Sequence, residues 1–405
     1  MSQTFNAIQK REEALLCRTY GRYPLALAKG KGSRLWDCDG KEYVDLLAGI
    51  AVTALGHCNE ELAQVMERQA RKLIHVSNLF YQEEQLELAQ RLLATCHLDK
   101  AFFCNSGAEA NEAAVKLARR YMQRVRNKDA YEVITFSGCF HGRTLAMIAA
   151  TGGQRFQDGF APIPEGFVQA SWGDLDALRA AITPKTAAIL IEVVQGEGGI
   201  RALTPGYAKD LENICREKDI LFMVDEVQCG LGRTGKMWGF QHFGLQPDVL
   251  TSAKALANGL PLGAMLTSDK VAAGFVTGSH ATTFGGGALL TTLGVKILEI
   301  MERDKLVARA GAVGTRLKMR LEAVGEKLPG TIREVRGLGL MIGVDLVVPA
   351  KPVWEKLIRR GFICNLTQDT VLRLLPSLTV DEADLAAFAD TLEDILATRP
   401  GQSPD

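Results

Sequence analysis

The sequence predicts an α/β protein whose mainly parallel β-sheet is covered by helices on both faces, joined to a smaller α+β part. From about residue 57 onward, short apolar runs alternate with stretches of helical periodicity, a pattern typical of parallel sheets. The runs expected to form strands cover 101–104, 131–136, 187–193, 220–225 and 248–251. The helical patterns cover 60–73, 83–95, 174–182 and 205–218. Ligands of such sheets bind beyond the carboxyl ends of the strands.

Both ends of the chain depart from this alternation. Residues 1–20 are expected to form an amphipathic helix with an entry segment, and residues 23–50 alternate short strands with turns such as Asp39-Gly40. A long helical pattern runs from about 290 to 327. Strands at 331–336 and 340–347 follow it, then helices at 351–360 and from 381, with a frayed end at 400–405. We divide the chain into 1–56, 57–300 and 301–405, and expect the first and last segments to form one small domain.

The composition excludes several classes of protein. The 405 residues include 47 basic and 47 acidic side chains, so no net field favours nucleic acid or acidic membranes. The nine cysteines are scattered and odd in number, without a C-x-x-C pair, which indicates reduced thiols in a cytoplasm-like compartment. The first residues lack the apolar core of a secretory signal, and no apolar run approaches the ~20 residues of a membrane span. We therefore expect a cytoplasmic protein without nucleic-acid or membrane partners.

Two charged residues end apolar strands and are candidates for chemistry. Lys254 lies among small and apolar neighbours, which disfavour its ammonium form and make the amine available as a nucleophile toward carbonyls. An ordinary surface lysine is the alternative. Asp225 ends the strand 220–225, where a carboxylate in a dry sheet needs a cationic partner. The protonated ring nitrogen of a cofactor is one candidate, and a structural ion pair is the other.

Two glycine-containing turns suit a phosphate group. Ser106 and Glu109 have the spacing of a capping box, and Gly107 lets the backbone of the expected helix approach a ligand. Free N–H groups at a helix N-terminus favour a phosphate, although a plain N-cap fits equally well. Thr282-Thr283 precede the glycines 285–287 and suit a second set of phosphate contacts, or a plain turn.

Three further loops and strands carry charges. Phe140 and Arg143 combine an aromatic face with a cation that clamps a carboxylate. Glu197 lies in a glycine-rich loop, which is alternatively a flexible surface loop. Arg373 is a charge within an apolar strand and needs an anion, with a structural salt bridge as the simpler interpretation. Cys139 and His141 lack the other ligands of a metal site, so no metal is expected.

Gly230–Gly235 matches G-x-G-x-x-G but lacks the context of a dinucleotide-binding fingerprint. Four residues separate it from its strand, no amphipathic helix follows, and no acidic residue lies about twenty positions on. A nicotinamide or flavin site is therefore not expected here.

Taken together, these residues resemble those of the class III, fold-type I aminotransferases that use pyridoxal phosphate, and within that family the acetylornithine aminotransferases. The resemblance extends from about Tyr20 to about residue 395. It is carried by the motifs GKEYVDLLAGIAVTALGHC, FFCNSGAEANEAAVKLAR, FHGRT, QGEGG, VDEVQCGLGRTG, PDVLTSAKAL, TTFGG and VLRLLPSL. It implies a seven-stranded, mainly parallel sheet in the large domain, and a homodimer with shared active sites.

The resemblance also assigns roles to matching positions. Lys254 is implied as the Schiff-base lysine and proton carrier, and Asp225 as the partner of the cofactor's ring nitrogen. The remaining implied cofactor contacts are Ser106, Gly107, Ala108, Phe140, Gln228 and, toward the partner subunit's cofactor, Thr283. The implied substrate contacts are Arg143, Arg373, Glu197 and Tyr20.

The implied reaction transfers the ω-amino group of N2-acetylornithine to 2-oxoglutarate, a ping-pong reaction of arginine biosynthesis. Arg143 is expected to bind the donor's distant carboxylate. Arg373 is expected to bind the α-carboxylate of glutamate, after Glu197, which neutralises it, swings away. Ornithine, succinylornithine, N-acetyllysine and 4-aminobutyrate remain alternative donors. A non-catalytic relative is disfavoured because Lys254 and Asp225 are both present.

The chain differs from the usual family pattern at four places. Gly287-Ala288 stands in place of Asn-Pro, Ala281 in place of glycine, Ala108 in place of threonine, and Asn258 lies in a segment that is usually glycine-rich. The first three flank the expected phosphate site, so its detailed contacts are expected to differ from those of the family.

Overall fold

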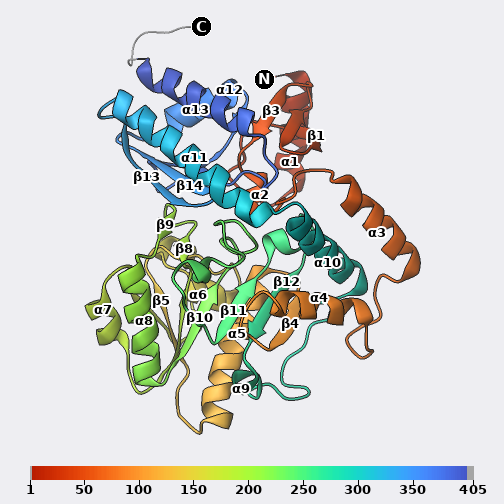
Figure 1. The fold of residues 1–405 in the computed structure, drawn as a ribbon, viewed down its shortest axis with the longest axis vertical. Helices are drawn as coiled ribbons and strands as arrows, with labels where there is room; N and C mark the ends of the chain where they lie inside the picture. Colours follow the sequence, from red (N-terminus) through yellow and green to blue (C-terminus); the bar gives the residue numbers. More distant parts are fainter. Residues whose placement is uncertain (1, 399–405) are drawn as a thin grey trace.

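The computed structural model describes residues 2–398, which form a large lower part and a smaller upper part in the view of Figure 1. The frayed end predicted for 400–405 lies outside these residues. The helices of the lower part are α3 (Glu60–Lys72), α4 (Glu83–Leu93), α5 (Gly107–Arg120), α6 (Leu145–Ala150), α7 (Leu175–Ala181), α8 (Pro205–Lys218), α9 (Asp269–Ala272) and α10 (Ala288–Arg303). Across residues 2–398, no helix is long and apolar enough to cross a membrane.

A seven-stranded sheet forms the centre of the lower part. Its strands lie in the order β4 (Lys100–Cys104), β12 (Gly263–Thr267), β11 (Val249–Ser252), β10 (Leu221–Asp225), β7 (Thr186–Ile191), β5 (Glu132–Phe136) and β6 (Phe167–Ala170). All are parallel except β12, which pairs antiparallel with both neighbours. Neither β6 nor β12 was predicted from the sequence, and β6 is only partly buried along its four residues. The β12 strand returns directly from the turn after Lys254 without a crossover helix.

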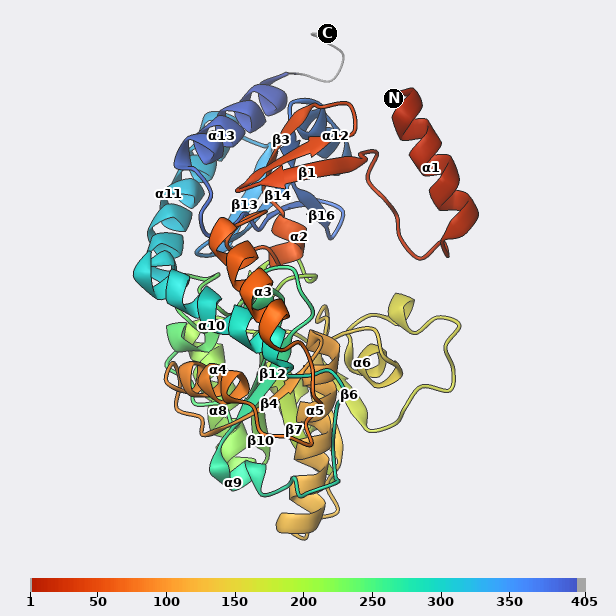
Figure 2. The same ribbon diagram turned by 90° about the vertical axis from the view of Figure 1, so that its right-hand side faces the viewer.

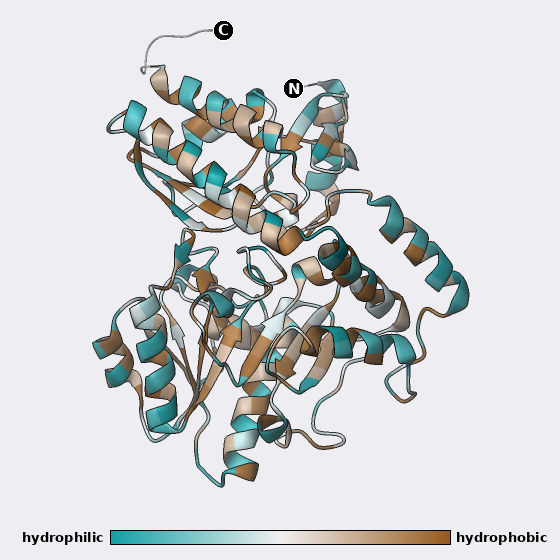
Figure 3. Ribbon diagram, in the orientation of Figure 1, coloured by the Kyte–Doolittle hydropathy of each residue, from teal (hydrophilic) through white to brown (hydrophobic). Residues whose placement is uncertain are grey.

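Two hydrophobic clusters cover the two faces of this sheet. Along β10, Leu221 and Met223 point to the cluster that contains α5, whereas Phe222 and Val224 point to the cluster that contains α8. This alternation follows from the period of two in a strand. Figure 3 shows the strands coloured mostly hydrophobic, while α8 carries hydrophilic residues on its outer side. By the same alternation, Asp225 extends toward α5.

Segments from both ends of the chain share the upper part. The strands β1 (Leu27–Lys31), β2 (Arg34–Asp37) and β3 (Glu42–Asp45) form a sheet with β15 (Phe362–Ile363). A second sheet has the order β13 (Ile332–Leu338), β14 (Met341–Leu346), β17 (Val371–Leu374) and β16 (Asn365–Thr367). The helices here are α11 (Leu306–Lys327), α12 (Lys351–Arg359) and α13 (Glu382–Ala397). The expected α+β architecture is present, and the domain boundaries stay a prediction.

The helical pattern predicted over 290–327 is present as two helices, because the chain breaks between α10 and α11. Lys305 adopts a left-handed conformation with φ of 51° and ends the periodic run without a glycine or proline. The sequence therefore gave no breaker signal at this point. The break redirects the chain from the lower part to the upper part (Figure 1).

The G-x-G-x-x-G segment joins the two parts of the molecule. A Cβ added at Gly235 would lie 2.7 Å from Gly311 Cα in α11, so the two backbones touch. The buried Arg233 guanidinium donates hydrogen bonds to the carbonyls of Leu340 (3.1 Å) and Pro376 (2.5 Å). The segment therefore serves packing, which agrees with the exclusion of a dinucleotide site.

Helix α1 (Gln3–Leu15) and the short helical turn α2 (Ala48–Ala51) belong to the N-terminal segment. None of the residues of α1 is buried, and Figure 2 shows the helix standing away from the rest of the chain. Its side chains Leu15 and the adjacent Leu16 are 73% and 54% exposed. Exposed apolar side chains on a helix edge are typical of a surface that another molecule covers.

Candidate active site

A cavity of about 460 Å³ opens at the carboxyl ends of the central strands. This is the position that the topology of a parallel sheet predicts for a ligand. The predicted site residues that line it are Ser106, Gly107, Ala108, Phe140, Arg143, Asp225, Gln228 and Lys254. The structure thus brings Ser106 and Lys254 to one cavity, although they are almost 150 positions apart in the sequence.

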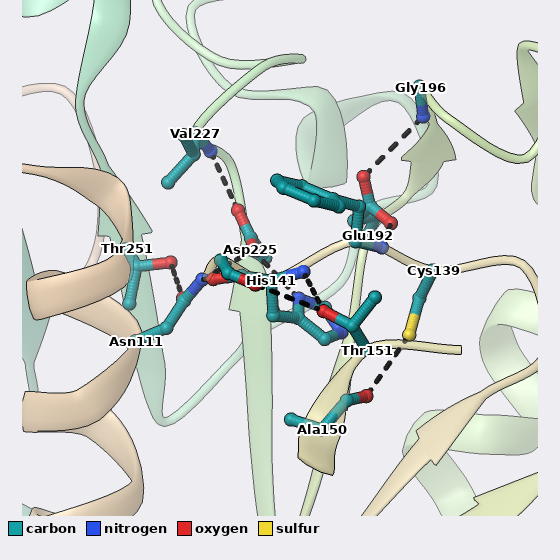
Figure 4. Close-up of polar contacts among 12 residues, drawn as sticks. Asn111, Cys139, His141, Ala150, Thr151, Glu192, Gly196, Asp225, Val227 and Thr251 are labelled. Atoms are coloured by element: carbon teal, nitrogen blue, oxygen red, sulfur yellow. Dashed lines mark hydrogen bonds and ion pairs between the residues drawn. The ribbon is translucent and has the colours of Figure 1, made fainter. Parts of the chain in front are cut away.

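Asp225 is held by a buried hydrogen-bond network (Figure 4). Its Oδ2 atom accepts a bond from Asn111 Nδ2 (2.7 Å) and lies 2.8 Å from His141 Nδ1. Its Oδ1 atom accepts a bond from the Val227 N–H (3.0 Å). Thr251, which pairs with Asp225 in the sheet, donates its hydroxyl to Asn111 Oδ1 (2.7 Å). The carboxylate is therefore fixed in orientation on the wall of the cavity.

Asn111 was not predicted from the sequence, although a signal was present. Asn111 lies on the buried stripe of α5 that also contains Ala114 and Ala118, three and seven residues further on. A polar side chain in an apolar stripe needs a buried partner. That partner is Asp225, from a strand 114 positions away in the sequence, and no local pattern identifies it.

Lys254 follows β11 at the start of a 3₁₀ turn (Lys254–Ala257). Its φ of 45° is left-handed, a conformation that costs free energy for a residue with a side chain and that clusters at functional sites. Burial lowers the pKa of Lys254; Asp225 opposes this effect, and the charge of Arg373 adds to it. The amine is therefore neutral over a wider pH range than that of a free lysine.

The N-terminus of α5 forms a narrow cradle at one end of the cavity. Ser106 Oγ accepts a bond from the Glu109 N–H (3.2 Å), as the predicted capping-box spacing requires. Glu109 reaches past the cap to the Asn105 N–H (2.5 Å), so the reciprocal half of the box is displaced by one residue. A Cβ at Gly107 would lie 2.6 Å from Val227 Cγ1, so only glycine fits there. The first N–H groups of the helix face this cradle without intrahelical partners.

Glu192 is a second buried carboxylate that the sequence analysis did not identify. It accepts a bond from the Gly196 N–H (3.4 Å; Figure 4) and another from the Phe140 N–H (3.0 Å). Glu192 so joins the two loops that carry Phe140 and Glu197. Burial, with a contribution from Asp225, raises the pKa of Glu192 to about 7. Its only sequence signal is its place at the end of the buried strand β7.

Arg143 is exposed at the mouth of the cavity. Its guanidinium lies 5.6 Å from the ring centroid of Phe140 and 4.7 Å from that of Phe156. The two rings flank the cation without neutralising it, so it stays available to a carboxylate. Phe140 itself is half-buried and lines the cavity.

Arg373 and Glu197 form an ion pair beside this cavity. Arg373 lies on β17 and is 1% exposed, and its Nη1 atom lies 2.5 Å from Glu197 Oε1. The Glu197 side chain is 29% exposed, so it has room to move. Both charges lie near enough to Lys254 to influence its pKa. The loop after β7 thus brings an acidic residue to a buried arginine from another part of the chain.

Two other predicted residues, Tyr20 and Thr283, also do not line the cavity of the single chain. Tyr20 is 75% exposed and its ring faces the Arg22 guanidinium at 5.2 Å. Thr283 is exposed on the loop before α10. The Asn258 departure has a clear role: it accepts a bond from the Leu55 N–H (2.7 Å) and donates to the Gly56 carbonyl (3.1 Å). It thereby ties the N-terminal segment to the turn that carries Lys254.

The residues of the cavity fit pyridoxal phosphate. The cradle of α5 suits the phosphate, Phe140 offers a ring face, and the fixed carboxylate of Asp225 suits a protonated ring nitrogen. Within residues 2–398, the buried Oε1 atom of Gln228 has no hydrogen-bond partner, although it lines the same cavity. A polar group left without a partner in a cavity indicates that a ligand completes it.

Comparisons with known proteins agree with this geometry. Residues 16–396 match the family model of class-III aminotransferases. The acetylornithine aminotransferase of Methanocaldococcus jannaschii is 45% identical over 380 residues, which cover 93% of this chain and 94% of that protein. The protein of the same name from Myxococcus xanthus is 43% identical over 385 residues, covering 95% of this chain and 96% of its own.

Solved structures give the same result. The ornithine aminotransferase of Toxoplasma gondii ME49 superposes with a TM-score of 0.93 at 30% identity, covering 98% of this chain and 95% of its own. The acetylornithine aminotransferase of Elizabethkingia anophelis superposes with a TM-score of 0.85 at 29% identity, covering 97% of this chain and 98% of its own. The predicted fold class and cofactor are confirmed.

Proposed function

Because this chain belongs to the class-III aminotransferase family, we propose that it transfers the ω-amino group of N2-acetyl-L-ornithine to 2-oxoglutarate. The products are N-acetyl-L-glutamate 5-semialdehyde and L-glutamate, and the two half-reactions share one site in a ping-pong sequence. Nearly full-length identity of 40–45% to acetylornithine aminotransferases favours this donor over ornithine.

The observation that carries this proposal is the pair of arginines at different depths. Arg143 lies at the mouth of the cavity, whereas Arg373 is buried and paired with Glu197. A donor that reacts through its ω-amine places its α-carboxylate far from the reacting carbon, where Arg143 binds it. Glutamate reacts through its α-amine, so its two carboxylates need both arginines. Glu197 neutralises Arg373 in the first half-reaction. In the second half-reaction the Glu197 side chain moves away, and the α-carboxylate of the substrate binds Arg373.

Each catalytic side chain then has a defined task. When bound, pyridoxal phosphate supplies an electron sink for the carbon that loses its proton. Asp225, fixed by Asn111 and His141, keeps a proton on the ring nitrogen. Lys254, whose pKa burial lowers, would hold the cofactor through its amine and would move the proton at the amino-bearing carbon of the substrate. Phe140, Ser106, Gly107, Ala108 and Gln228 hold the cofactor in place.

Replacing Arg373 by alanine should impair the two half-reactions unequally. The loss of a buried, charge-assisted contact to the α-carboxylate corresponds to about 3 kcal/mol, or about 100-fold, in the half-reaction with glutamate or 2-oxoglutarate. The half-reaction with N-acetylornithine should change by less than about tenfold, because Arg373 is neutralised there. Single-turnover absorbance measures each half-reaction separately. The control Arg143→Ala should impair both half-reactions, and equal losses in Arg373→Ala would refute the assignment.

We also propose that two copies of this chain form a homodimer with shared active sites. In the segment between α3 and α4, the side chains of Leu79, Phe80 and Tyr81 are 86%, 66% and 103% exposed. Asn78 from this segment donates to the carbonyls of Thr282 and Gly285, so it lies beside the loop that carries Thr283. Phe284 in that loop is 65% exposed. Sedimentation should give twice the 44.0 kDa of one chain.

The dimer supplies a reason for the exposed position of Thr283. In one chain its hydroxyl lies outside the cavity, and in a dimer it extends to the phosphate of the partner subunit. The dimer also explains why no residue of helix α1 is buried in one chain, because the partner subunit covers this helix. Replacing Phe80 by glutamate should yield single chains in sedimentation, with cofactor affinity reduced. The cytoplasmic location stays a prediction that rests on the scattered, unpaired cysteines.

A further inference from the structure

The Arg373 guanidinium loses its counter-ion whenever the Glu197 side chain moves away. Among residues 2–398, Glu197 is the one carboxylate within ion-pair distance of the Arg373 guanidinium. A buried guanidinium without its carboxylate keeps a full charge and several donors unpaired, and the long side chain regains rotational freedom. A second contact is needed to keep the guanidinium aimed at the incoming α-carboxylate.

Asn365 provides that contact from the neighbouring strand. Asn365 on β16 is paired directly with Arg373 on β17 in the antiparallel register. Its Oδ1 atom accepts bonds from Arg373 Nε (2.9 Å) and Nη2 (2.5 Å). These two donors form one edge of the guanidinium, whereas Nη1, on the other edge, contacts Glu197. A single amide thus holds the Nε/Nη2 edge of the guanidinium, which we call its inner edge. It leaves Nη1, on the outer edge, for a carboxylate.

Tyr23 fixes the orientation of this amide. Asn365 Nδ2 donates to Tyr23 Oη at 2.5 Å, and arginine has no acceptor, so only Oδ1 is able to face Arg373. The Tyr23 ring packs edge-on against Trp354, with centroids 4.6 Å apart. Trp354 Nε1 in turn donates to the Cys364 carbonyl (2.9 Å), next to Asn365. Burial raises the pKa of Tyr23, so its hydroxyl stays neutral.

The backbone of the Glu197 loop is anchored separately. Thr367 Oγ1 (2.7 Å) and Gln368 Nε2 (2.8 Å) both donate to the Glu197 carbonyl. The loop is therefore held to the same β16 region while the carboxylate side chain is only partly buried. The exchange of anions on Arg373 requires movement of the Glu197 side chain alone, with the main chain and the inner edge of the guanidinium fixed.

We propose that Asn365, oriented by Tyr23, is a positioning residue that selects for substrates whose α-carboxylate lies next to the reacting amine or carbonyl, by holding the Nε/Nη2 edge of Arg373 without neutralising it. The proposal rests on the proposed role of Arg373 in the glutamate half-reaction. The neutrality of the amide is essential. An aspartate of the same shape would pair permanently with the guanidinium and compete with both Glu197 and the substrate.

The test compares Asn365→Asp, Asn365→Ala and Tyr23→Phe in separate half-reactions. Asn365→Asp should raise the dissociation constants of glutamate and 2-oxoglutarate by about 30-fold, and Asn365→Ala by about tenfold, with saturating rates within about threefold of the original. The constants for N-acetylornithine should change by less than about threefold. Tyr23→Phe should raise the dissociation constant of glutamate about threefold. In the double variant with Asn365→Ala it should cause no further rise, because Tyr23 acts through the same amide.

Controls separate this proposal from the proposed function and from a fold defect. Calorimetric binding of glutarate, a dicarboxylate that does not react, should weaken by the same factors, which gives a readout independent of turnover. Tyr43→Phe, whose hydroxyl donates to Asp37 in the same part of the molecule, should leave glutarate binding unchanged. Equal changes for both substrates, or unchanged glutarate binding in Asn365→Asp, would overturn the positioning role. If Arg373→Ala itself weakens the binding of glutamate and N-acetylornithine equally, the proposed role of Arg373 is wrong, and the role of Asn365 that rests on it is wrong as well.

Discussion

Replacing Lys254 by alanine should abolish amino-group transfer, with a loss of roughly 10⁴-fold or more in both half-reactions. The lysine is the one amine that lines the cavity among residues 2–398, and it combines two functions there, covalent attachment and proton transfer. Its left-handed backbone at φ 45° and its lowered pKa both depend on the same buried turn.

The measurement has two independent parts. Borohydride reduction of the original protein with pyridoxal phosphate should label Lys254, as peptide mapping detects, whereas Lys254→Ala should take up no label. Single-turnover absorbance should show no conversion by the variant. Lys318→Ala, at a lysine on the outer side of α11, should retain both the label and the activity. Label on another lysine, or activity in Lys254→Ala above about 1% of the original, would contradict the assignment.

Replacing Asp225 by asparagine should reduce the rate of proton transfer by about 10²–10³-fold, the effect typical of removing one preorganised electrostatic contact. The shape is preserved, but an amide does not keep a proton on the ring nitrogen. The new Nδ2 group would also face the donor atoms of Asn111 and His141, so the network that orients this position would lose its acceptor. The loss should appear in the single-turnover rate at saturating substrate.

The adjacent Glu226 gives a matched control. Its carboxylate points to the other side of the strand, where it accepts bonds from the N–H groups of Gly239 (2.8 Å) and Phe240 (2.7 Å). Glu226→Gln should therefore leave the single-turnover rate within about threefold of the original, even if it lowers stability. Comparable losses of rate in Asp225→Asn and Glu226→Gln would show that the effect is structural.

The sequence predicted the parts of the site whose signals are local. Ser106 stands at a helix start, and Asp225 and Lys254 stand near strand ends, so period, capping and the topology of a parallel sheet place all three at one edge. The family motifs then supplied their roles. These signals can be recognised in the sequence because each depends on a few neighbouring residues.

The parts that were missed depend on distant pairing. Asn111 and Glu192 are polar residues in apolar segments, and their partners come from other strands and loops. Asn365 and Tyr23 lie 342 positions apart in the chain and meet only because segments from both ends form the upper part. The break at Lys305 and the antiparallel strand β12 lack a local marker for the same reason. Contacts of this kind are set by tertiary packing.

The measurement that tests the account most directly is the donor preference in single-turnover experiments. The holoenzyme is mixed with N-acetylornithine, ornithine, succinylornithine, N-acetyllysine or 4-aminobutyrate, and the rate constant divided by the dissociation constant is obtained for each. 2-Oxoglutarate then completes the cycle. We expect N-acetylornithine to give the highest value, at least about tenfold above ornithine and 4-aminobutyrate. A higher value for either of those two donors would contradict the proposed function.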